Sequence, residues 1–485
     1  MPKPDHIFDR SLEWSDLEAV VTGTDPGPRV GLVYGRRRQG KSYLLRALAA
    51  EHRAIYYQAL EEEREPALAR VGTLVAQEAG LSGSVAYSDW KTAFGELVTL
   101  ARGRLIILDE FPYLVAKSPE LPSVIQDAFD AARSAQAPAF RLVVCGSAMS
   151  IMSDLLSGQR ALRGRVSLES LLRPFDYRTA AEFWGIADPL TAFLVHAVLG
   201  GTPGYRPLLF GDAPQRADEF EPWLFQGVLN PSSALFREAD YLLTEDPAMT
   251  DRALYQSVLA AIAEGHNTRN AIGKVLARTD AALRHPLLVL ERASFIRRDE
   301  DLWRSRRPLI RLDDPFLRFQ FAVVRRDLAR FESRLTAEAW ADARETFASR
   351  VLGPHFEQLS RSWTERHASA TTLGGRPSKV GVTQLNDAAG RSRVEIDVVA
   401  VTGNPDADRP RVLAIGEARG GTSERTLRDL RKLDRARELL EARADVRQTR
   451  LLLFSLAGFD ASLREAVASR RDVELVDLER LYFGS

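Results

Sequence analysis

An eight-residue stretch, residues 35–42, carries the residue types that bind nucleotide phosphates. It reads GRRRQGKS, follows an apolar run, and satisfies G-x-x-x-x-G-K-[ST] at every fixed position. Its glycines would let the backbone wrap the phosphates with N–H groups pointing at the anion. Lys41 would place a cation on the β- and γ-phosphates, and Ser42 would offer a hydroxyl to Mg²⁺. The residues predicted to line ATP and Mg²⁺ are Gly35, Arg36, Arg37, Arg38, Gln39, Gly40, Lys41, Ser42 and Tyr43.

The stretch LIILDEF, residues 105–111, places two adjacent carboxylates after a buried strand. Its four leading apolar residues predict the strand, and Asp109 follows at the carboxyl end, where it would hold Mg²⁺ through water. Glu110 would polarise the attacking water. An Asp-Glu pair downstream of a phosphate loop favours hydrolysis over transfer of phosphate to a second small molecule.

Two other residues are candidates for contact with the γ-phosphate. Ser147 ends the strand-like run LVVCGS and would sense that phosphate, although a plain strand-to-turn transition gives the same pattern. Arg165, like Arg163, precedes the next strand-like run and could reach a nucleotide within its subunit or across a subunit contact. An ordinary surface arginine is the alternative. Because Arg165 could act across a subunit contact, the sequence also leaves open whether the protein forms a homo-oligomer.

The elements that would position these residues alternate along the first half of the chain. Strand-like runs that are almost continuously apolar are separated by helix-like stretches, a pattern typical of a parallel sheet covered on both faces. The predicted strands are residues 29–34, 54–60, 104–108, 141–145 and 166–171. After Pro174 the pattern turns helical, and α/β signals return near residue 349. Strands are predicted there at residues 393–401, 411–418, 449–454 and 473–476. The predicted fold class is therefore α/β and multi-domain.

Composition excludes several classes of protein. The 66 Lys and Arg residues balance 66 Asp and Glu residues, so a polyanion site must be local. Cys145 is the single cysteine, which excludes a disulfide framework and a cysteine zinc site and fits a reducing compartment. No apolar run approaches the roughly 20 residues of a membrane span, and the first residues do not resemble a secretory signal. We expect a cytoplasmic protein without a membrane partner.

Taken together, the motifs resemble those of archaeal-type P-loop ATPases of the AAA+/STAND branch. Besides the phosphate loop, the resemblance runs through FDRSLEWSDL, LDEFPYL, CGSAMSIM, LRGR, RPFDY, GGTPGY and LDDPFLRFQF, and it covers almost the whole chain. It implies a five-stranded core in which the strand of Asp109 lies beside the phosphate-loop strand. It also places Phe8 and Arg10 near adenine and brings Pro203, in GGTPGY, toward the nucleotide.

The resemblance also implies the division of the chain into domains. A 485-residue chain has room for about three domains. We expect a P-loop ATPase core at residues 1–176, a helical lid at 177–246 and a winged helix at 247–313. A linker at 314–345 and a restriction-endonuclease-like α/β domain at 346–485 would follow.

The expected winged helix would offer DNA a basic surface. Residues 280–291 form an amphipathic stretch typical of a recognition helix, in which Pro286 should kink the helix or mark its start. The alternative is a winged helix that packs on its neighbours and touches no nucleic acid. The basic residues of the predicted hairpin, which could contact phosphates, are Arg297, Arg298, Arg304, Arg306 and Arg307.

Two predicted strands near the C-terminus carry a layout similar to the D…E-x-K signature of restriction-endonuclease-like proteins. Strand side chains alternate between faces. Ile396 and Val398 should therefore share one face while Asp397 takes the other, and Glu417 and Arg419 should lie on a common face.

The resemblance implies that Asp397 and Glu417 bind Mg²⁺ and that Glu357 adds a carboxylate. Arg419 stands where lysine is usual, and arginine stays protonated and cannot act as a general base. Lys432 could substitute for it. Two hypotheses follow: a nuclease gated by ATP turnover, with DNA as its partner, and a signalling switch whose C-terminal domain binds a partner without cleaving it.

Overall fold

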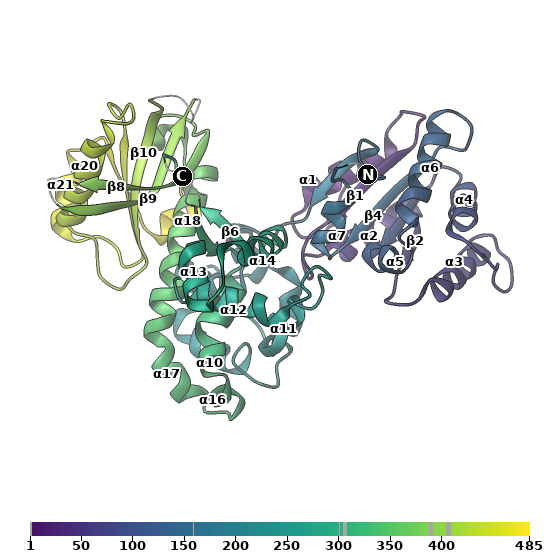
Figure 1. Ribbon diagram of the computed structural model, residues 1–485. Coiled ribbons are helices and arrows are strands. Elements are labelled where there is room, and N and C mark those ends of the chain that lie inside the picture. The colour runs from purple at the N-terminus through teal and green to yellow at the C-terminus, as the bar shows by residue number, and fades with distance from the viewer. Residues whose placement is uncertain (1, 159, 300, 304–307, 388–390, 404–408) are drawn as a thin grey trace. The chain divides into compact units, whose positions relative to one another are not determined.

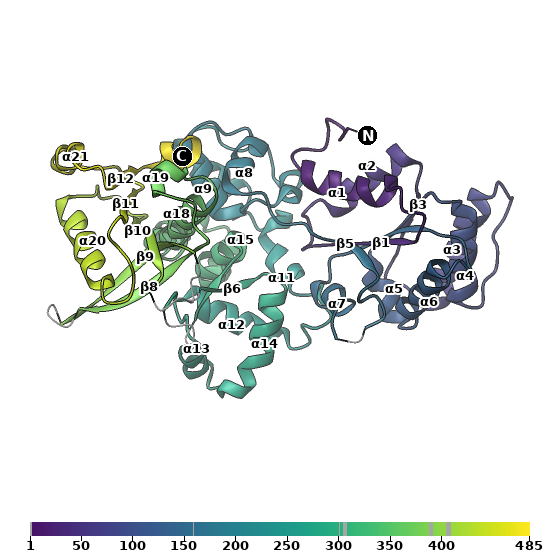
Figure 2. The same cartoon turned by 90° about the horizontal axis from the view of Figure 1, so that it is seen from above.

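A computed structural model describes residues 2–158, 160–299, 301–303, 308–387, 391–403 and 409–485 (Figures 1 and 2). These residues form two compact units. Unit 1 contains Met1–Pro174, Thr202–Pro207 and Asp240–Thr250, and unit 2 contains Phe175–Gly201, Leu208–Ala239 and Asp251–Ser485. Two segments from the region expected to form a lid thus belong to unit 1.

The described part of unit 1 is built on one parallel sheet with the strand order β2-β3-β4-β1-β5. The strands are β1 (Arg29–Tyr34), β2 (Ile55–Gln58), β3 (Leu105–Asp109), β4 (Arg141–Gly146) and β5 (Val166–Leu171). The predicted strands and the parallel sheet are confirmed. The expected pairing of β3 with β1 is wrong, because β4 lies between them and pairs with both.

Apolar side chains cover both faces of this sheet, because its strands are almost continuously apolar. Along β1, Val30 and Leu32 join one buried cluster and Val33 joins a second. The first cluster is completed by α3 (Arg64–Glu78), α4 (Trp90–Ala101), α5 (Phe111–Lys117) and α6 (Leu121–Arg133), and the second by α1 (Ser11–Thr22) and α2 (Lys41–His52). The carboxyl ends of the parallel strands meet at one edge of the sheet, where the phosphate loop, Asp109 and Ser147 lie.

The first part of unit 2 is helical, as predicted after Pro174. Its helices are α8 (Tyr177–Trp184), α9 (Pro189–Leu199), α10 (Phe220–Gln226), α12 (Arg252–Ala263), α13 (Arg269–Leu276) and α14 (Asp280–Arg292), and α11 (Glu238–Leu242) spans residues of both units. Helix α14 runs through Pro286, which therefore does not mark its start. The predicted hairpin follows as antiparallel strands β6 (Ile296–Asp299) and β7 (Leu309–Leu312).

Residues 314–345, expected to be a linker, contribute to the core of unit 2. Phe316 and Trp340 are buried, because these apolar side chains lie on the side of each helix that faces the core. The helices are α15 (Pro315–Phe319), α16 (Leu328–Glu332) and α17 (Thr336–Thr346), and α17 continues through a π-helical turn (Phe347–Leu352) into α18 (Gly353–Arg366).

The C-terminal part of unit 2 is a mixed sheet with the order β12-β11-β10-β9-β8. Pairs β8–β9 and β9–β10 are antiparallel, and β10–β11 and β11–β12 are parallel. The strands are β8 (Lys379–Asp387), β9 (Ser392–Thr402), β10 (Arg411–Arg419), β11 (Arg450–Ser455) and β12 (Val473–Val476). The accompanying helices are α19 (Ala370–Leu373), α20 (Leu427–Leu440), α21 (Ala461–Ala468) and α22 (Leu478–Phe483).

Different helices cover the two faces of this second sheet. On one face, Trp363 of α18 meets Phe454 of β11, with ring centroids 5.8 Å apart. On the other face, Leu430 of α20 shares a buried cluster with Leu453, the residue before Phe454. Alternation along β11 thus assigns α18 and α20 to opposite faces.

A β-bulge in β9 changes which side chains share a face. Asp397 and Val398 together lie opposite the single Val382 of β8, because the register shifts there by one residue. Ile396 therefore joins the same cluster as Val399. The expected common face of Ile396 and Val398 is wrong, since strict alternation holds only for a strand without a bulge.

Two histidines form a buried hydrogen-bonded pair in unit 2. Nδ1 of His196, in α9, lies 3.0 Å from Nε2 of His355, in α18. A guanidinium nitrogen of Arg318 lies 3.4 Å from Nδ1 of His355. Because arginine can only donate, the network assigns His355 as the donor to His196. Burial lowers the pKa of both imidazoles, that of His196 to about 4.

This pair predicts that unit 2 loses stability in mild acid. An unfolded imidazole binds a proton with a pKa of about 6.5, whereas the folded His196 does so near 4. The unfolded chain therefore binds more protons in this window, and each such histidine costs about 1.4 kcal/mol per pH unit below about 6.5. Urea unfolding at pH 7.5 and 5.5 should show this loss, and the double variant His196→Gln/His355→Gln should show a smaller one. The exposed His285 offers a control, since His285→Gln should keep the wild-type pH dependence. An unchanged pH dependence in the double variant would contradict the assignment.

Candidate active site

The phosphate loop is the turn that joins β1 to α2, whose first residue is Lys41. Gly40 has a φ of 88°, in the left-handed region that favours glycine. A Cβ on Gly35 would lie 2.4 Å from the main-chain oxygen of Leu172. Both fixed glycines of the motif are thus required by the backbone. Ser42 lies in the first turn of α2, where helix N–H groups lack partners within the helix and attract anions.

The ammonium of Lys41 is buried inside the loop. Its Nζ donates to the main-chain oxygens of Gly35, at 2.7 Å, and Arg36, at 3.0 Å. Burying a cation costs free energy unless negative charge approaches it, and neutral carbonyls compensate only in part. The loop therefore fits a phosphate group at Lys41.

Asp109 is fully buried at the end of β3. Its Oδ2 accepts a hydrogen bond from the hydroxyl of Tyr56, and its Oδ1 accepts one from the N–H of Glu110 at 3.0 Å. Because protein donors occupy both oxygens, the residue fits a Mg²⁺ held through water. Burial raises the pKa of Tyr56, which keeps its hydroxyl a donor. Sequence reasoning missed Tyr56, since nothing local to β2 signals a contact with the neighbouring strand.

Glu110 turns out of the strand into the site. Its φ of 53° is left-handed, an unusual conformation for a glutamate and one that clusters at functional sites. The Ser147 hydroxyl lies 3.3 Å from its Oε2 and donates to it. Burial raises the pKa of Glu110, and the charge of Lys41 opposes that rise. Lys41, Glu110 and Ser147, far apart in sequence, thus lie at one edge of the sheet.

The segment Thr202–Pro207 packs against the phosphate loop within unit 1. The N–H of Gly204 donates to the main-chain oxygen of Arg38 at 2.9 Å. A Cβ on Gly40 would lie 4.0 Å from Cγ of Pro203. Pro203 therefore borders the loop, and its approach to a nucleotide stays a prediction.

The segment Asp240–Thr250 also reaches the site and was missed by sequence reasoning. Glu245 forms an ion pair with Arg37 of the phosphate loop. Asp246 accepts from the N–H of Ser150 at 2.9 Å and from its hydroxyl, in helix α7 (Met149–Asp154) just after Ser147. The segment thus contacts both the loop and the helix that follows Ser147.

The N-terminal residues named by the resemblance lie beside the loop. Arg10 donates to the main-chain oxygens of Arg173, at 2.7 Å, and Gln39, at 3.4 Å. Phe8 is partly exposed, and Tyr43, on the outer side of α2, is largely exposed. The structure therefore gives Arg10 a structural contact with the loop, and the position of adenine stays a prediction.

Arg165 forms an ion pair with a helix of its own unit. Its Nε and a terminal nitrogen donate to both carboxylate oxygens of Asp130, in α6, at 2.9 and 2.6 Å. This bidentate pair uses the fork that an arginine finger would present to a phosphate. Arg163 donates to the main-chain oxygen of Gly158 at 2.5 Å. A catalytic role for Arg165 would require its pair with Asp130 to break.

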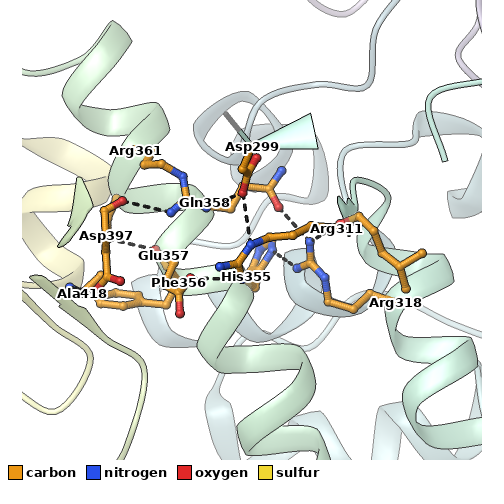
Figure 3. Close-up of polar contacts among 12 residues, drawn as sticks. Asp299, Arg311, Arg318, His355, Phe356, Glu357, Gln358, Arg361, Asp397 and Ala418 are labelled. Carbon is orange, nitrogen blue, oxygen red and sulfur yellow. Dashed lines mark hydrogen bonds and ion pairs between the residues drawn. The ribbon is translucent and has the colours of Figure 1, made fainter. Parts of the chain in front are cut away.

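In the C-terminal domain, Asp397 and Glu357 lie close together and are held by other groups (Figure 3). Oδ2 of Asp397 accepts from the N–H of Ala418 at 2.8 Å, and its main-chain oxygen accepts from Arg361 at 3.0 Å. Glu357, in α18, is ion-paired with Arg311 of β7 at 3.4 Å. Burial, and then repulsion from Glu357, raises the pKa of Asp397 above its ordinary value.

Glu417 leaves the sheet on the face that α20 covers. It follows Ile415, a member of the cluster on that face, by two residues. Its Oε1 lies 3.2 Å from the guanidinium of Arg425, whose side chain is fully buried. Arg419, two residues further, lies 3.8 Å from Asp429 of α20.

The arrangement does not fit the divalent cation that the resemblance implied for this domain. Asp397 points toward Glu357 of α18 (Figure 3). Glu417 lies on the other face of the sheet, because it follows Ile415 of the α20-side cluster by two residues. Within the described part of the chain, no group of three or more His, Cys, Asp or Glu side chains is placed to hold a metal. Arg419 cannot accept a proton, and Lys432 is exposed on α20. The expected set is therefore assembled only in part: Asp397 and Glu357 lie close together, whereas Glu417 lies on the other face and is paired with Arg425.

The basic residues expected on the hairpin are also paired where they are described. Arg297 contacts Asp299 at 2.7 Å and Asp313 at 3.0 Å. Arg298 contacts Glu291 at 2.8 Å. The remaining members, Arg304, Arg306 and Arg307, lie outside the described residues. The described arginines of the hairpin thus neutralise carboxylates of the same unit.

Comparison with known proteins bears on the unit that holds the phosphate loop. Residues 7–187 match a family described as "ATPase domain predominantly from Archaea". The uncharacterized protein MJECL04 of Methanocaldococcus jannaschii is 25% identical over 338 residues, which cover 68% of this chain and 72% of that protein. No helix in the described ranges has the length and apolar character to cross a membrane.

The first of two matching solved structures has a similar fold. The Walker-type ATPase PABY2304 of Pyrococcus abyssi has a TM-score of 0.50 at 22% identity, over 66% of this chain and 97% of that one. The ORC2 protein of Aeropyrum pernix, solved as ADPNP–ADP complexes, has a TM-score of 0.45 at 14% identity, over 69% of this chain and 99% of that one. Residues 7–187 are therefore similar to archaeal ATPase domains, and unit 1 has the parallel sheet of a P-loop fold.

Proposed function

We propose that this protein is a Mg²⁺-dependent ATP hydrolase whose nucleotide state controls its C-terminal modules. The observation that carries the proposal is the convergence of Lys41, Asp109, Glu110 and Ser147 at the carboxyl edge of one parallel sheet. These groups come from three different strands or the turns after them, and hydrolysis needs each of their chemistries.

Each residue has a distinct role in this proposal. The loop backbone and Lys41 bind the phosphates, and Ser42 and Asp109 hold Mg²⁺, Asp109 through water. Bound Mg²⁺ supplies positive charge for the β- and γ-phosphates. Glu110 orients the attacking water, and its contact with Ser147 links it to the position of the γ-phosphate.

Two contacts of the loop support coupling to the rest of the chain. Pro203 and Gly204 border the loop at one place, and Glu245 pairs with Arg37 at another. Both segments continue directly along the chain into unit 2. A phosphate that repositions the loop would therefore pull on both connections.

DNA is the proposed partner of the region that follows. The order α12, α13, α14, β6 and β7 is that of a winged helix, and Arg284 and His285 on α14 are exposed. We propose this helix as the nucleic-acid surface, because Arg284 is largely exposed although it forms an ion pair with Asp280 at 3.7 Å. Homo-oligomer formation stays a prediction tied to Arg165.

A second candidate is a signalling switch whose C-terminal domain binds without cleaving. The ion pairs of Glu357 with Arg311 and Glu417 with Arg425 favour it, because each removes a carboxylate from metal binding. The two candidates share the same ATPase mechanism. They differ in the C-terminal domain, which would cleave DNA in a nuclease gated by ATP and would only bind a partner in a signalling switch.

Two substitutions separate binding from hydrolysis. Lys41→Ala should abolish ATP binding in calorimetry, because it removes the buried cation at the phosphates. Glu110→Gln should keep ATP binding and lose hydrolysis, with turnover reduced by a factor of about 100 or more. Equal turnover by Glu110→Gln and wild type would remove Glu110 from the mechanism.

The contact between Gly204 and the loop gives a second test. A Cβ on Gly204 would lie 2.6 Å from Cβ and 2.8 Å from the main-chain oxygen of Arg38, so Gly204→Ala must displace the segment from the loop. We expect the Kd for ATP to rise about tenfold, given the usual cost of overpacking. The control is Gly95→Ala, at an exposed helical site with open space around it, which should leave the Kd unchanged. Equal Kd values for the two variants would contradict the contact.

A plasmid-nicking assay separates the two candidates for the C-terminal domain. With Mg²⁺ or Mn²⁺ and ATP, we expect wild type to cleave no faster than Asp397→Ala, because the carboxylates are not assembled around a cation. Cleavage by wild type that Asp397→Ala abolishes would instead establish the nuclease.

A further inference from the structure

The hairpin formed by β6 and β7 is fastened to the C-terminal domain within unit 2. Residues 301–303, which follow β6, lie along β8 at the edge of the domain's sheet. Oδ2 of Asp301 accepts from the N–H of Gln384 at 2.9 Å, and Oδ1 accepts from the hydroxyl of Thr383 at 3.0 Å. The N–H of Leu302 donates to the main-chain oxygen of Val382 at 3.1 Å. The hairpin therefore covers part of an edge strand that would otherwise offer unpaired backbone groups.

Apolar packing reinforces this attachment. Leu302 and Trp303 pack against the buried cluster of the C-terminal domain, which includes Leu385 and Ile396. In a winged helix that binds DNA through its wing, this part of the hairpin would face the duplex. Here Leu302 and Trp303 of this part pack against the C-terminal domain of the same chain instead.

A chain of charges joins the base of the hairpin to the acidic residues of the domain (Figure 3). Arg311 of β7 contacts Asp299 of β6 at 3.2 Å and Glu357 of α18 at 3.4 Å. Arg361, one turn after Glu357, lies 3.7 Å from Asp299 and donates to the main-chain oxygen of Asp397 at 3.0 Å.

These side chains have restricted access to water. The exposed fraction is 19% for Arg311, 24% for Glu357 and 11% for Asp299. Ion pairs shielded from solvent in this way are screened less by salt than surface pairs. Removing one partner leaves a partly buried charge without compensation, which is costly.

We propose that the β6–β7 hairpin is an intramolecular latch on the C-terminal domain, in which Arg311 supplies to Glu357 the positive charge that a divalent cation would supply in a nuclease. The latch uses Asp301, Leu302 and Trp303 to hold the sheet edge and Arg311 to neutralise the acidic residues. It goes beyond the proposed ATPase and does not depend on nucleotide, so it can fail while the ATPase proposal stands.

Electron paramagnetic resonance can measure Mn²⁺ binding to the nucleotide-free full chain. This measurement tests whether Arg311 takes the place of a cation at Glu357. Wild type should bind no stoichiometric Mn²⁺. Arg311→Met keeps the length of the side chain but removes its charge, so it should gain one Mn²⁺ per chain. Adding Glu357→Gln to that variant should abolish the gain, and Arg311→Lys should behave as wild type.

The matched control is Arg298→Met, which removes an arginine of the same hairpin that pairs with Glu291 instead. It should bind no Mn²⁺. A stoichiometric site in wild type that Glu357→Gln abolishes, or no gain in a folded Arg311→Met, would overturn the proposal. Circular dichroism establishes whether the variants are folded. If Arg311→Met does not fold, Arg311→Lys still tests the proposal, because Mn²⁺ binding by Arg311→Lys would also overturn it.

Amide hydrogen exchange tests whether Asp301 holds the edge strand β8. Asp301→Ala removes the acceptor of the Gln384 N–H, so exchange at that amide should rise about tenfold, the factor expected for one lost hydrogen bond. Amides of β11, in the middle of the sheet, should keep their wild-type rates. Unchanged exchange at Gln384 would show that the hairpin does not hold β8.

Discussion

A single buried ammonium group constrains most of unit 1. Lys41 is enclosed by a turn whose carbonyl oxygens compensate its charge only in part, so the loop favours an anion at this position. The strand order sets where that anion can lie. Because β4 separates β1 from β3, the loop and Asp109 stand two strand spacings apart, roughly 10 Å. That width leaves room for phosphate and water, with Ser147 of the intervening strand beside Glu110.

In unit 2, unlike at Lys41, the shielded charges are paired with opposite charges of the chain itself. Its acidic residues are met by arginines of the same chain, Arg311 at Glu357 and Arg425 at Glu417. An arginine in these positions fixes geometry through a planar fork and cannot give up its proton. The C-terminal part of unit 2 thus supplies its own counter-charges, and Arg311 also connects it to the hairpin.

The parts of the fold that follow local rules were predictable from the sequence. The phosphate loop, its flanking strand and helix, and β3 with Asp109 follow from motif spacing and apolar runs. Strand β8 was missed because its sequence, KVGVTQLND, mixes polar and apolar residues without a clear run. The bulge at Asp397 was missed because alternation assumes an unbroken register.

The long-range ion pairs were beyond such reasoning for a physical reason. Asp130 as the partner of Arg165, Glu245 as that of Arg37, and Arg311 as that of Glu357 depend on which elements pack together. In a chain whose basic and acidic residues are equal in number, the sequence offers many partners for each arginine. Only the packing selects among them.

The most direct measurement is an anomalous-scattering map from crystals grown with a non-hydrolysable ATP analogue and Mn²⁺. We predict one strong Mn²⁺ peak between the Ser42 hydroxyl and Asp109, next to the β- and γ-phosphates, and none at Asp397, Glu357 or Glu417. A phosphate loop without nucleotide and metal would contradict the central claim.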